Sequence, residues 1–179
     1  VPSKIDQLMR TVNEFKLDYI MGSVHYIGDW LIDTERQLDE WKRRDVDQVC
    51  QQYYLMVQQM TKTRLFDVVG HLDLVKKFGF KPRGDLTGLQ TETVEAISQN
   101  QMCVEVNTSG LRKPCNEIYP SEKLLKMCFD EGIPITLGSD AHIPEDVGAG
   151  FDKGIEAARQ VGYVEIIRFT QRKRDFVEI

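Results

Sequence analysis

A short apolar run and two metal-binding residue types meet in Ile133-Pro134-Ile135-Thr136-Leu137-Gly138-Ser139-Asp140-Ala141-His142. The run is typical of a buried strand. Because residues i and i+2 of an extended chain point the same way, Asp140 and His142 could both bind one metal ion. The alternative for this pair is an Asx-turn followed by an exposed histidine.

The other two histidines of the chain also follow apolar runs. Residues 19–24 lead to His25, and residues 65–70 lead to His71. Imidazole and carboxylate groups suit zinc, manganese or iron(II). We therefore predict a metal site where these strands end. A lone histidine after a strand is often only a hydrogen-bonded surface or core residue, and for His25 this alternative stays open.

Helix and strand patterns alternate along the whole chain. Besides the strands ending at residues 25, 71, 107 and 140, a last strand is predicted over 164–169. Helices are predicted over 5–15, 46–60, 91–98, from a Ser121 cap to a Gly132 stop, and over 151–161. This order is typical of βαβ units in an α/β fold with a parallel sheet, in which active sites lie at the carboxyl ends of the strands. No linker or repeat divides residues 1–179, so we expect a single domain.

Composition excludes several classes of protein. A net charge of −5 and a pI near 5.3 argue against a nucleic-acid surface. No apolar run approaches the roughly 20 residues that span a bilayer, and the charged first ten residues do not match a signal peptide. The four scattered cysteines are interpreted as reduced packing residues, which favours the cytoplasm.

The loop after the strand ending at Asn107 carries hydroxyl groups, a glycine and two cations. Its residues Ser109, Arg112 and Lys113 could bind an anion, because the guanidinium fork of arginine suits a phosphate. The alternative interpretation of this loop is a solvated turn that binds no anion. Asp29, shortly after His25, could line a pocket for a cationic or aromatic ligand. Asp73 is interpreted as a structural residue or as one that orients a neighbouring imidazole.

Five segments occur in an order that resembles the histidinol-phosphatase family of the PHP (polymerase and histidinol phosphatase) superfamily. The resemblance runs from about residue 18 to residue 163, most of the chain. The segments are Gly22-Ser23-Val24-His25, Gly70-His71-Leu72-Asp73, Glu105-Val106-Asn107-Thr108-Ser109-Gly110-Leu111-Arg112, Glu117-Ile118-Tyr119-Pro120-Ser121 and Gly138-Ser139-Asp140-Ala141-His142.

This resemblance implies a distorted (β/α)7 barrel that carries up to three divalent metal ions. It implies that the ligands include His25, His71, Asp140 and His142, and that Arg112 binds a substrate phosphate with Ser109 close by; Asp29 is a further candidate for substrate binding. The implied reaction is hydrolysis of L-histidinol phosphate to L-histidinol and phosphate in histidine biosynthesis, a branch of amino-acid biosynthesis. The partner would be a small phosphomonoester, with no nucleic acid and no membrane.

The family's opening His-x-His, a further histidine and a bridging glutamate would lie upstream of Val1. We therefore expect a barrel that is incomplete at the N-terminus, and a chain that is inactive by itself. Two alternatives stay open for the function. One is a PHP phosphoesterase with another phosphomonoester substrate, and the other is a non-catalytic PHP-like binding module.

Overall fold

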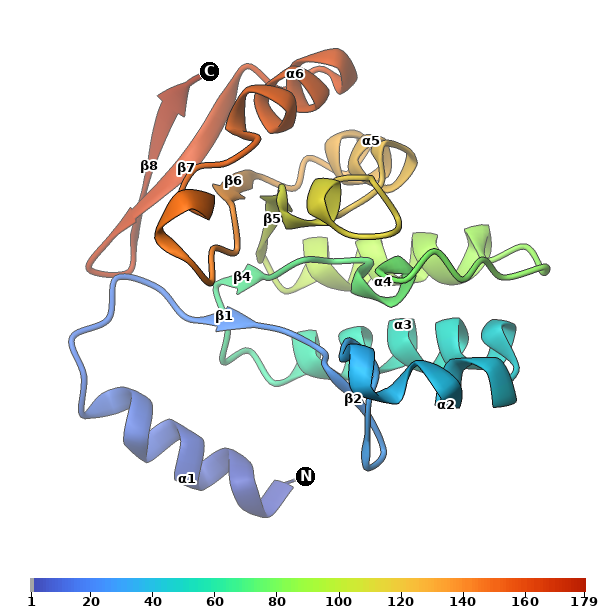
Figure 1. The fold of residues 1–179 in the computed structure, drawn as a ribbon. Coiled ribbons are helices and arrows are strands. Elements are labelled where there is room, and N and C mark those ends of the chain that lie inside the picture. The colour runs from blue at the N-terminus through green and yellow to red at the C-terminus, as the bar shows by residue number, and fades with distance from the viewer. Residues whose placement is uncertain (1) are drawn as a thin grey trace.

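The computed structural model describes residues 2–179, apart from the side chains of residues 2–4, 6 and 13. Its centre is a sheet of four parallel strands in the order β1-β4-β5-β6. The strands are β1 (Met21–Gly22), β4 (Val68–Val69), β5 (Cys103–Asn107) and β6 (Ile135–Gly138). The predicted α/β fold with a parallel sheet is therefore confirmed. In the described residues the sheet is open rather than closed into a barrel (Figure 1).

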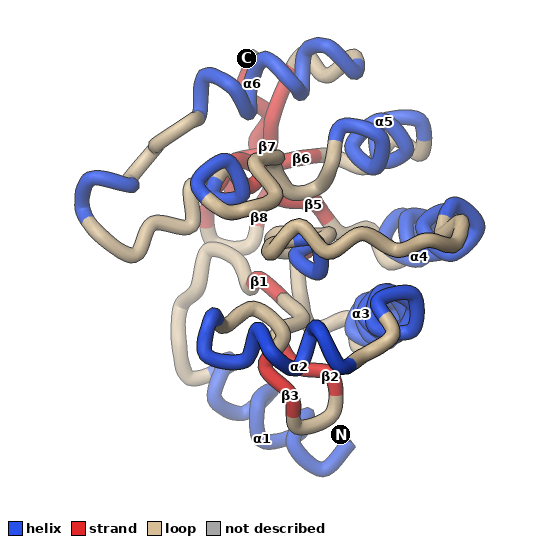
Figure 2. Tube along the Cα trace, turned by 45° about the vertical axis from the view of Figure 1, so that its right-hand side comes forward, coloured by secondary structure: helices blue, strands red, loops and turns tan. Residues whose placement is uncertain are grey.

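Helices connect the parallel strands and stack beside one another. They are α3 (Val46–Lys62), α4 (Thr87–Gln99), α5 (Glu122–Asp130) and α6 (Phe151–Val161). Figures 1 and 2 show α3, α4 and α5 in sequence order along one side of the sheet. Because each of these three helices lies between two strands of the sheet, all strand carboxyl ends reach the same edge. This arrangement places the predicted site residues at one edge.

The helix boundaries follow local signals. The Asp45 side chain accepts hydrogen bonds from the backbone N–H groups of Asp47 and Gln48, which caps α3. After α5, Gly132 has φ +66°, and its N–H and that of Ile133 bond to carbonyls of the last turn. The predicted Gly132 stop is confirmed. The predicted Ser121 cap is wrong in detail, because its side chain makes no capping bond.

Helix α4 begins four residues before the predicted start at residue 91. Its first turn contains Gly88, a poor helix former, so the sequence pattern is weak there. The side chain of Asp85 accepts a hydrogen bond of 2.9 Å from the backbone of Thr87, which favours the earlier start.

The chain after α6 forms a hairpin that the sequence did not predict. Strand β7 (Glu165–Thr170) pairs antiparallel with β8 (Lys173–Glu178). The turn between them is tight because Gln171 and Arg172 have φ values of +50° and +66°. Arg172 contacts Asp67 at 3.0 Å. The last predicted strand is thus present, but it belongs to a separate two-stranded sheet.

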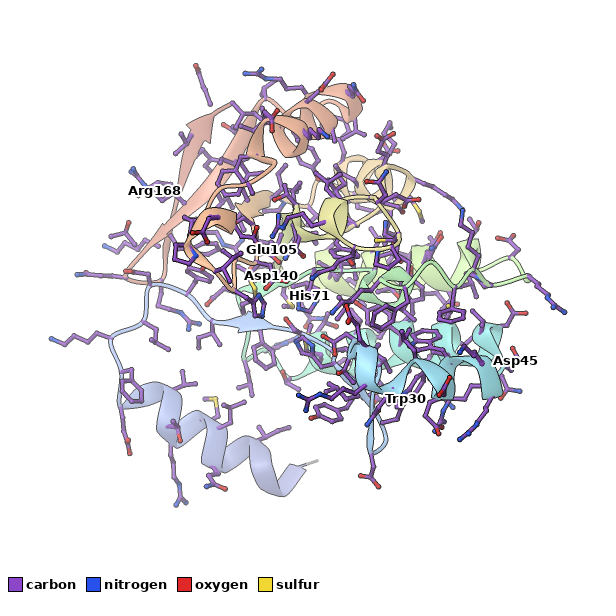
Figure 3. The ribbon with its side chains drawn as sticks, viewed as in Figure 1. Trp30, Asp45, His71, Glu105, Asp140 and Arg168 are labelled. Carbon is purple, nitrogen blue, oxygen red and sulfur yellow. The ribbon has the colours of Figure 1, made fainter. Side chains whose placement is uncertain are left out.

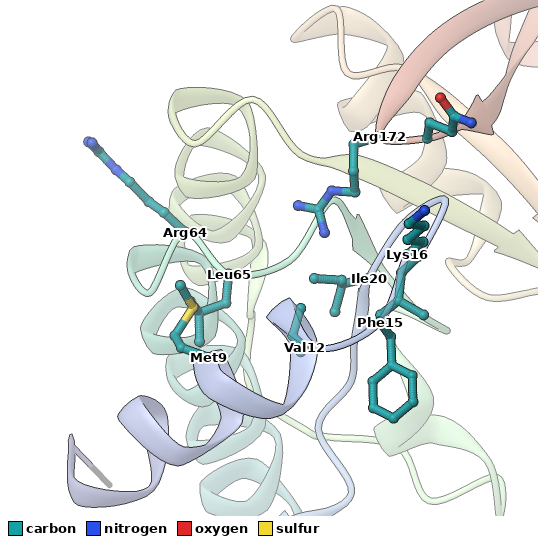
Figure 4. A pocket seen from close by; sticks show the side chains of 10 residues that line it. Met9, Val12, Phe15, Lys16, Ile20, Arg64, Leu65 and Arg172 are labelled. Atoms are coloured by element: carbon teal, nitrogen blue, oxygen red, sulfur yellow. The ribbon is translucent and has the colours of Figure 1, made fainter.

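Three smaller elements precede α3. They are α2 (Leu38–Arg43) and the antiparallel pair β2 (Tyr26–Ile27) and β3 (Trp30–Leu31). The first helix, α1 (Pro2–Asn13), lies apart from the sheet, across a groove of about 600 Å3 that is lined by both apolar and cationic side chains (Figure 4). Among the described residues, no helix has both the length and the apolar character needed to cross a membrane.

A buried polar contact ties α3 to the loop after β4. The Tyr54 hydroxyl donates to Asp73 Oδ1 at 2.8 Å and accepts from Gln90 Nε2 at 3.0 Å. Asp73 Oδ2 also contacts Lys76 Nζ at 3.1 Å and accepts from the Ser121 N–H at 3.3 Å. Asp73 therefore has the structural role that the sequence favoured.

Tyr54→Phe is expected to destabilise the protein by about 1.5–3 kcal/mol, because it removes a buried hydrogen bond to a carboxylate. Urea unfolding of the full-length gene product measures this difference. The control is Tyr19→Phe, since Tyr19 is exposed and its ring packs beside Phe169 at the surface. Equal midpoints for the two variants would contradict the assigned role of Tyr54.

Candidate metal centre

The carboxyl ends of the parallel strands open into one cavity of about 630 Å3. It contains six of the seven residues predicted to bind metal or substrate, the further anion-binding candidate Lys113, and several residues that were not predicted. The lining includes His25, His71, Ser109, Arg112, Asp140 and His142, together with Asp33, Lys77, Glu105, Asn107, Lys113, Tyr119 and Asp146. Side chains from widely separated segments therefore meet where the strand pattern predicted.

Asp29 is the predicted site residue that does not line this cavity. It is exposed in the turn between β2 and β3, and it lines a different depression with Trp30 and arginines of the α2 region. The reason is the hairpin, which carries the chain away from His25 before returning it. Asp29 therefore does not line the cavity that holds the other predicted site residues.

His25 and His71 meet edge to face at the base of the cavity. Their ring centroids are 4.8 Å apart and the ring planes are inclined by 75°. His25 follows β1, and its Nδ1 lies 3.2 Å from Asp33 Oδ2. His71 follows β4 in the neighbouring position of the sheet. The two imidazoles are thus brought together by adjacent parallel strands.

The imidazole of His71 is buried but has an unpaired nitrogen. Its Nδ1 has no hydrogen-bond partner, whereas buried polar atoms are normally paired. Burial, followed by the neighbouring His25, lowers the pKa of His71 to about 4, so the ring is neutral at pH 7. The backbone φ of +28° is also unusual for a residue other than glycine. A neutral, unpaired ring nitrogen suits a metal ligand.

The chain turns sharply at Asp140 instead of continuing as a strand. Asp140 has φ +49°, and β6 has already ended at Gly138. The extended geometry used to predict a shared ligand pair is therefore wrong. His142 Nδ1 donates to the carbonyl oxygen of Asp140 at 2.9 Å, and the His142 side chain is 84% exposed. Asp140 Oδ2 accepts a 3.2 Å hydrogen bond from Ser109 Oγ.

A buried carboxylate lies beneath these residues. Glu105 Oε2 accepts hydrogen bonds from the His71 N–H at 2.8 Å and from Asn107 Nδ2 at 3.0 Å. Figure 3 shows Glu105 near Asp140 and His71 at the centre of the molecule. Burial raises the pKa of Glu105, although both hydrogen bonds oppose the shift. Alternation along β5 places Glu105 and Asn107 on the same face of the strand, but this pattern alone does not assign them to the site.

Arg112 lies at the cavity with its guanidinium already oriented. Its Nη2 donates to the Ser139 carbonyl at 2.8 Å, and its Nε lies 3.3 Å from Asp146 Oδ1. Ser109 and Arg112 belong to one short 3-10 helix, Ser109–Arg112, directly after β5. The predicted anion-binding loop is therefore beside the imidazoles. Asp146, which the sequence did not indicate, holds the arginine from the loop after β6.

The donors fit a divalent metal ion by their chemistry. The imidazoles of His25 and His71, the latter with an unpaired Nδ1, and the carboxylate of Asp140 are ligand types that zinc accepts. No three His, Cys, Asp or Glu side chains converge as a ready metal-binding group in the part of the chain that the structure describes. His142 donates its Nδ1–H to the Asp140 carbonyl, which leaves Nε2 of this ring free to bind a metal ion.

Gly138→Ala is expected to destabilise the protein by at least about 2 kcal/mol. A Cβ at Gly138 would lie 1.8 Å from Glu105 Oε1, and Glu105 is buried and held by His71 and Asn107. Urea unfolding measures the loss. In a Glu105→Ala background the same substitution should cost much less, because the collision is removed. Gly88→Ala in α4 is the control, since nothing lies within 4 Å of the added methyl group; a similar loss in that variant would contradict the explanation.

Comparison with known proteins agrees with this arrangement. The PHP domain model matches residues 4–109. The chain is 36% identical over 164 residues to a Deinococcus radiodurans protein named probable histidinol-phosphatase, covering 92% of this chain and 62% of that protein. It is 37% identical over 93 residues to the histidinol-phosphatase of Bacillus subtilis, covering 49% of this chain and 35% of that protein.

A solved structure shares the fold. It is the histidinol phosphate phosphatase of Lactococcus lactis in complex with zinc, L-histidinol and phosphate, which superposes with a TM-score of 0.78 at 22% identity. The superposition covers 95% of this chain and 66% of that one. The chain thus spans less than two thirds of the length of these relatives. Since the PHP domain model matches more than half of its residues, the chain belongs to the PHP domain family.

Proposed function

We propose that the protein is a metal-dependent phosphomonoesterase that hydrolyses L-histidinol phosphate to L-histidinol and phosphate, a step of histidine biosynthesis. The observation that carries the proposal is the single cavity that holds imidazole and carboxylate donors beside Arg112 and Ser109. Relatives named histidinol-phosphatase, matched over most of this chain, support the choice of substrate.

In this proposal His25, His71, Asp140 and His142 hold divalent metal, which is zinc, manganese or iron, with up to three ions in the whole site. A bound metal supplies a Lewis acid that polarises the phosphoryl oxygens and favours ionisation of water. The neutral, unpaired His71 imidazole and the carboxylate of Asp140 fit this role. Glu105 holds the His71 backbone in place and so fixes the ring at the base of the cavity.

Arg112 is proposed to bind the phosphate. Its guanidinium is held by Ser139 and Asp146, which reduces the entropy lost when it binds an anion. The Ser109 hydroxyl lies beside Asp140 and orients that carboxylate. The reaction is displacement at phosphorus by water: a P–O bond to the water oxygen forms, the ester P–O bond breaks, and the proton lost by water balances the one that the alkoxide takes up to leave as histidinol. Arg112 compensates the negative charge on the phosphoryl oxygens.

Location in the cytoplasm is part of the same proposal. All four cysteines are free, and Cys50, Cys103 and Cys128 are buried in the core. Free thiols are typical of proteins in a reducing compartment. A small phosphomonoester is the proposed partner.

The test is phosphate release by the full-length gene product, loaded with zinc or manganese, from L-histidinol phosphate. We expect turnover that a chelator abolishes and that the added metal restores. Equal or faster turnover of sugar or nucleotide monophosphates would assign the protein to another phosphomonoester. Absence of turnover together with absence of metal binding would support a binding module instead.

A further inference from the structure

The carboxylate of Asp33 is a part of the cavity that the sequence pattern did not reveal. Asp33 Oδ2 lies 3.2 Å from His25 Nδ1, and only 18% of the Asp33 side chain is exposed. The hairpin β2-β3 makes this contact possible, because it returns the chain to His25 after eight residues. Gly28 (φ +62°) starts its two-residue turn.

Buried residues fix the position of Asp33. The N–H of the preceding residue, Ile32, donates to the His25 carbonyl at 2.9 Å, so the hairpin ends beside the histidine. The Ile32 carbonyl in turn accepts a 2.9 Å hydrogen bond from the indole N–H of Trp41. Ile32 and Trp41 are both almost completely buried. The Asp33 carboxylate is therefore attached to a rigid part of the core.

A cation from another segment also contacts Asp33. Lys77 Nζ donates to the Asp33 carbonyl at 2.6 Å and lies 3.8 Å from Oδ2. A carboxylate held between an imidazole N–H and a lysine ammonium can only accept hydrogen bonds.

An anionic acceptor at Nδ1 determines which nitrogen of His25 carries the proton. The hydrogen bond requires Nδ1–H, so the lone pair of the neutral ring is at Nε2. A carboxylate behind a metal-binding histidine fixes both the tautomer and the ring orientation, and it makes the ligand more basic. The contact between the His25 and His71 rings places this imidazole in the proposed metal site.

We propose that Asp33, with Lys77 as its counter-ion, is a positioning residue that holds His25 as the Nδ1–H tautomer with Nε2 available to a metal ion. Its catalytic consequence rests on the proposed function, but the tautomer and the metal affinity do not. The role of Asp33 can therefore be decided even if the protein hydrolyses a different substrate.

The first test is the tautomer of His25 in the metal-free, full-length gene product, measured by the 15N chemical shifts of its ring. We expect a protonated Nδ1 and an unprotonated Nε2 above the pH at which the ring becomes neutral. Asp33→Asn should reduce the preference for this tautomer, because the neutral amide is a weaker acceptor. Asp39→Asn is the matched control, since Asp39 is an exposed residue of α2 whose carboxylate pairs with Lys42. A protonated Nε2 in the unmodified protein would overturn the proposal.

The second test is a double-mutant cycle on zinc affinity, measured by competition with a chromophoric chelator. Asp33→Ala should weaken zinc binding by about 10–100-fold. In a His25→Ala background the same substitution should have almost no further effect, because its contribution passes through the imidazole. Equal losses in the two backgrounds would show a merely structural role and would overturn the proposal. If Asp33→Ala does not fold, Asp33→Asn replaces it in the cycle, with a smaller expected loss.

Discussion

Asp140→Asn is expected to lower kcat/KM for L-histidinol phosphate by about 1,000-fold or more. The Asp140 carboxylate lines the cavity beside the imidazoles. Its negative charge favours binding of a metal ion, and the neutral amide of asparagine carries no such charge. Metal-ion catalysis contributes several kcal/mol, and each 1.36 kcal/mol corresponds to a factor of ten in rate. The loss should therefore appear mainly in kcat, together with a lower zinc content.

Two measurements separate this effect from loss of structure. Zinc per protomer, determined after dialysis, should fall in Asp140→Asn, whereas thermal unfolding of the metal-free protein should change little because the side chain is partly exposed. Asp175→Asn is the matched control, since Asp175 is an exposed residue of β8 that is not among the residues lining the cavity. Full activity of Asp140→Asn with normal zinc content would remove Asp140 from the proposed ligands.

The sequence predicted where the strands end better than it predicted how long they are. Strands β1 and β4 are only two residues long, yet the apolar runs before His25 and His71 placed both imidazoles correctly. The reason is that a parallel sheet covered by helices requires continuous apolar runs, and their ends must meet at one edge. The Arg112 loop could be placed for the same reason, because it directly follows β5.

Backbone conformation at the site was less accessible to sequence reasoning. Nothing in the residue pattern indicates that His71 and Asp140 adopt positive φ, a conformation that is rare outside glycine and is often found at functional sites. The role of Glu105 depends on the absence of a side chain at Gly138 on the neighbouring strand, a relation visible only once β5 and β6 are paired.

The two hairpins, β2-β3 and β7-β8, were missed because their turns were not recognised from the residues. Ile27-Gly28-Asp29-Trp30 contains a signal for a two-residue turn, and recognising it would have predicted that the chain returns to His25. Asp33, rather than Asp29, would then have been the candidate beside the imidazole. The turn between β7 and β8 had no such signal, because Gln171 and Arg172 are not residues that favour positive φ.

Arg112→Ala is expected to lower kcat/KM for L-histidinol phosphate by about 100- to 1,000-fold, the usual cost of removing one group that stabilises charge in the transition state. Arg112→Lys should recover part of this loss. Lysine keeps the positive charge but lacks the planar guanidinium of arginine. In Arg112 that group can bind two phosphate oxygens while its Nε contacts Asp146. Steady-state kinetics of phosphate release measures both variants.

The comparison between Arg112 and Asp140 distinguishes phosphate binding from metal binding at one cavity. Arg112→Ala should leave zinc affinity unchanged, because a guanidinium donates hydrogen bonds and offers no lone pair to a metal. Inorganic phosphate should inhibit this variant much less strongly than the unmodified protein. Arg159→Ala, an exposed change in α6, is the control for a lost surface cation. If Arg112→Ala loses zinc while phosphate inhibition is retained, the arginine acts through the Ser139–Asp140 segment that it holds and not through the substrate.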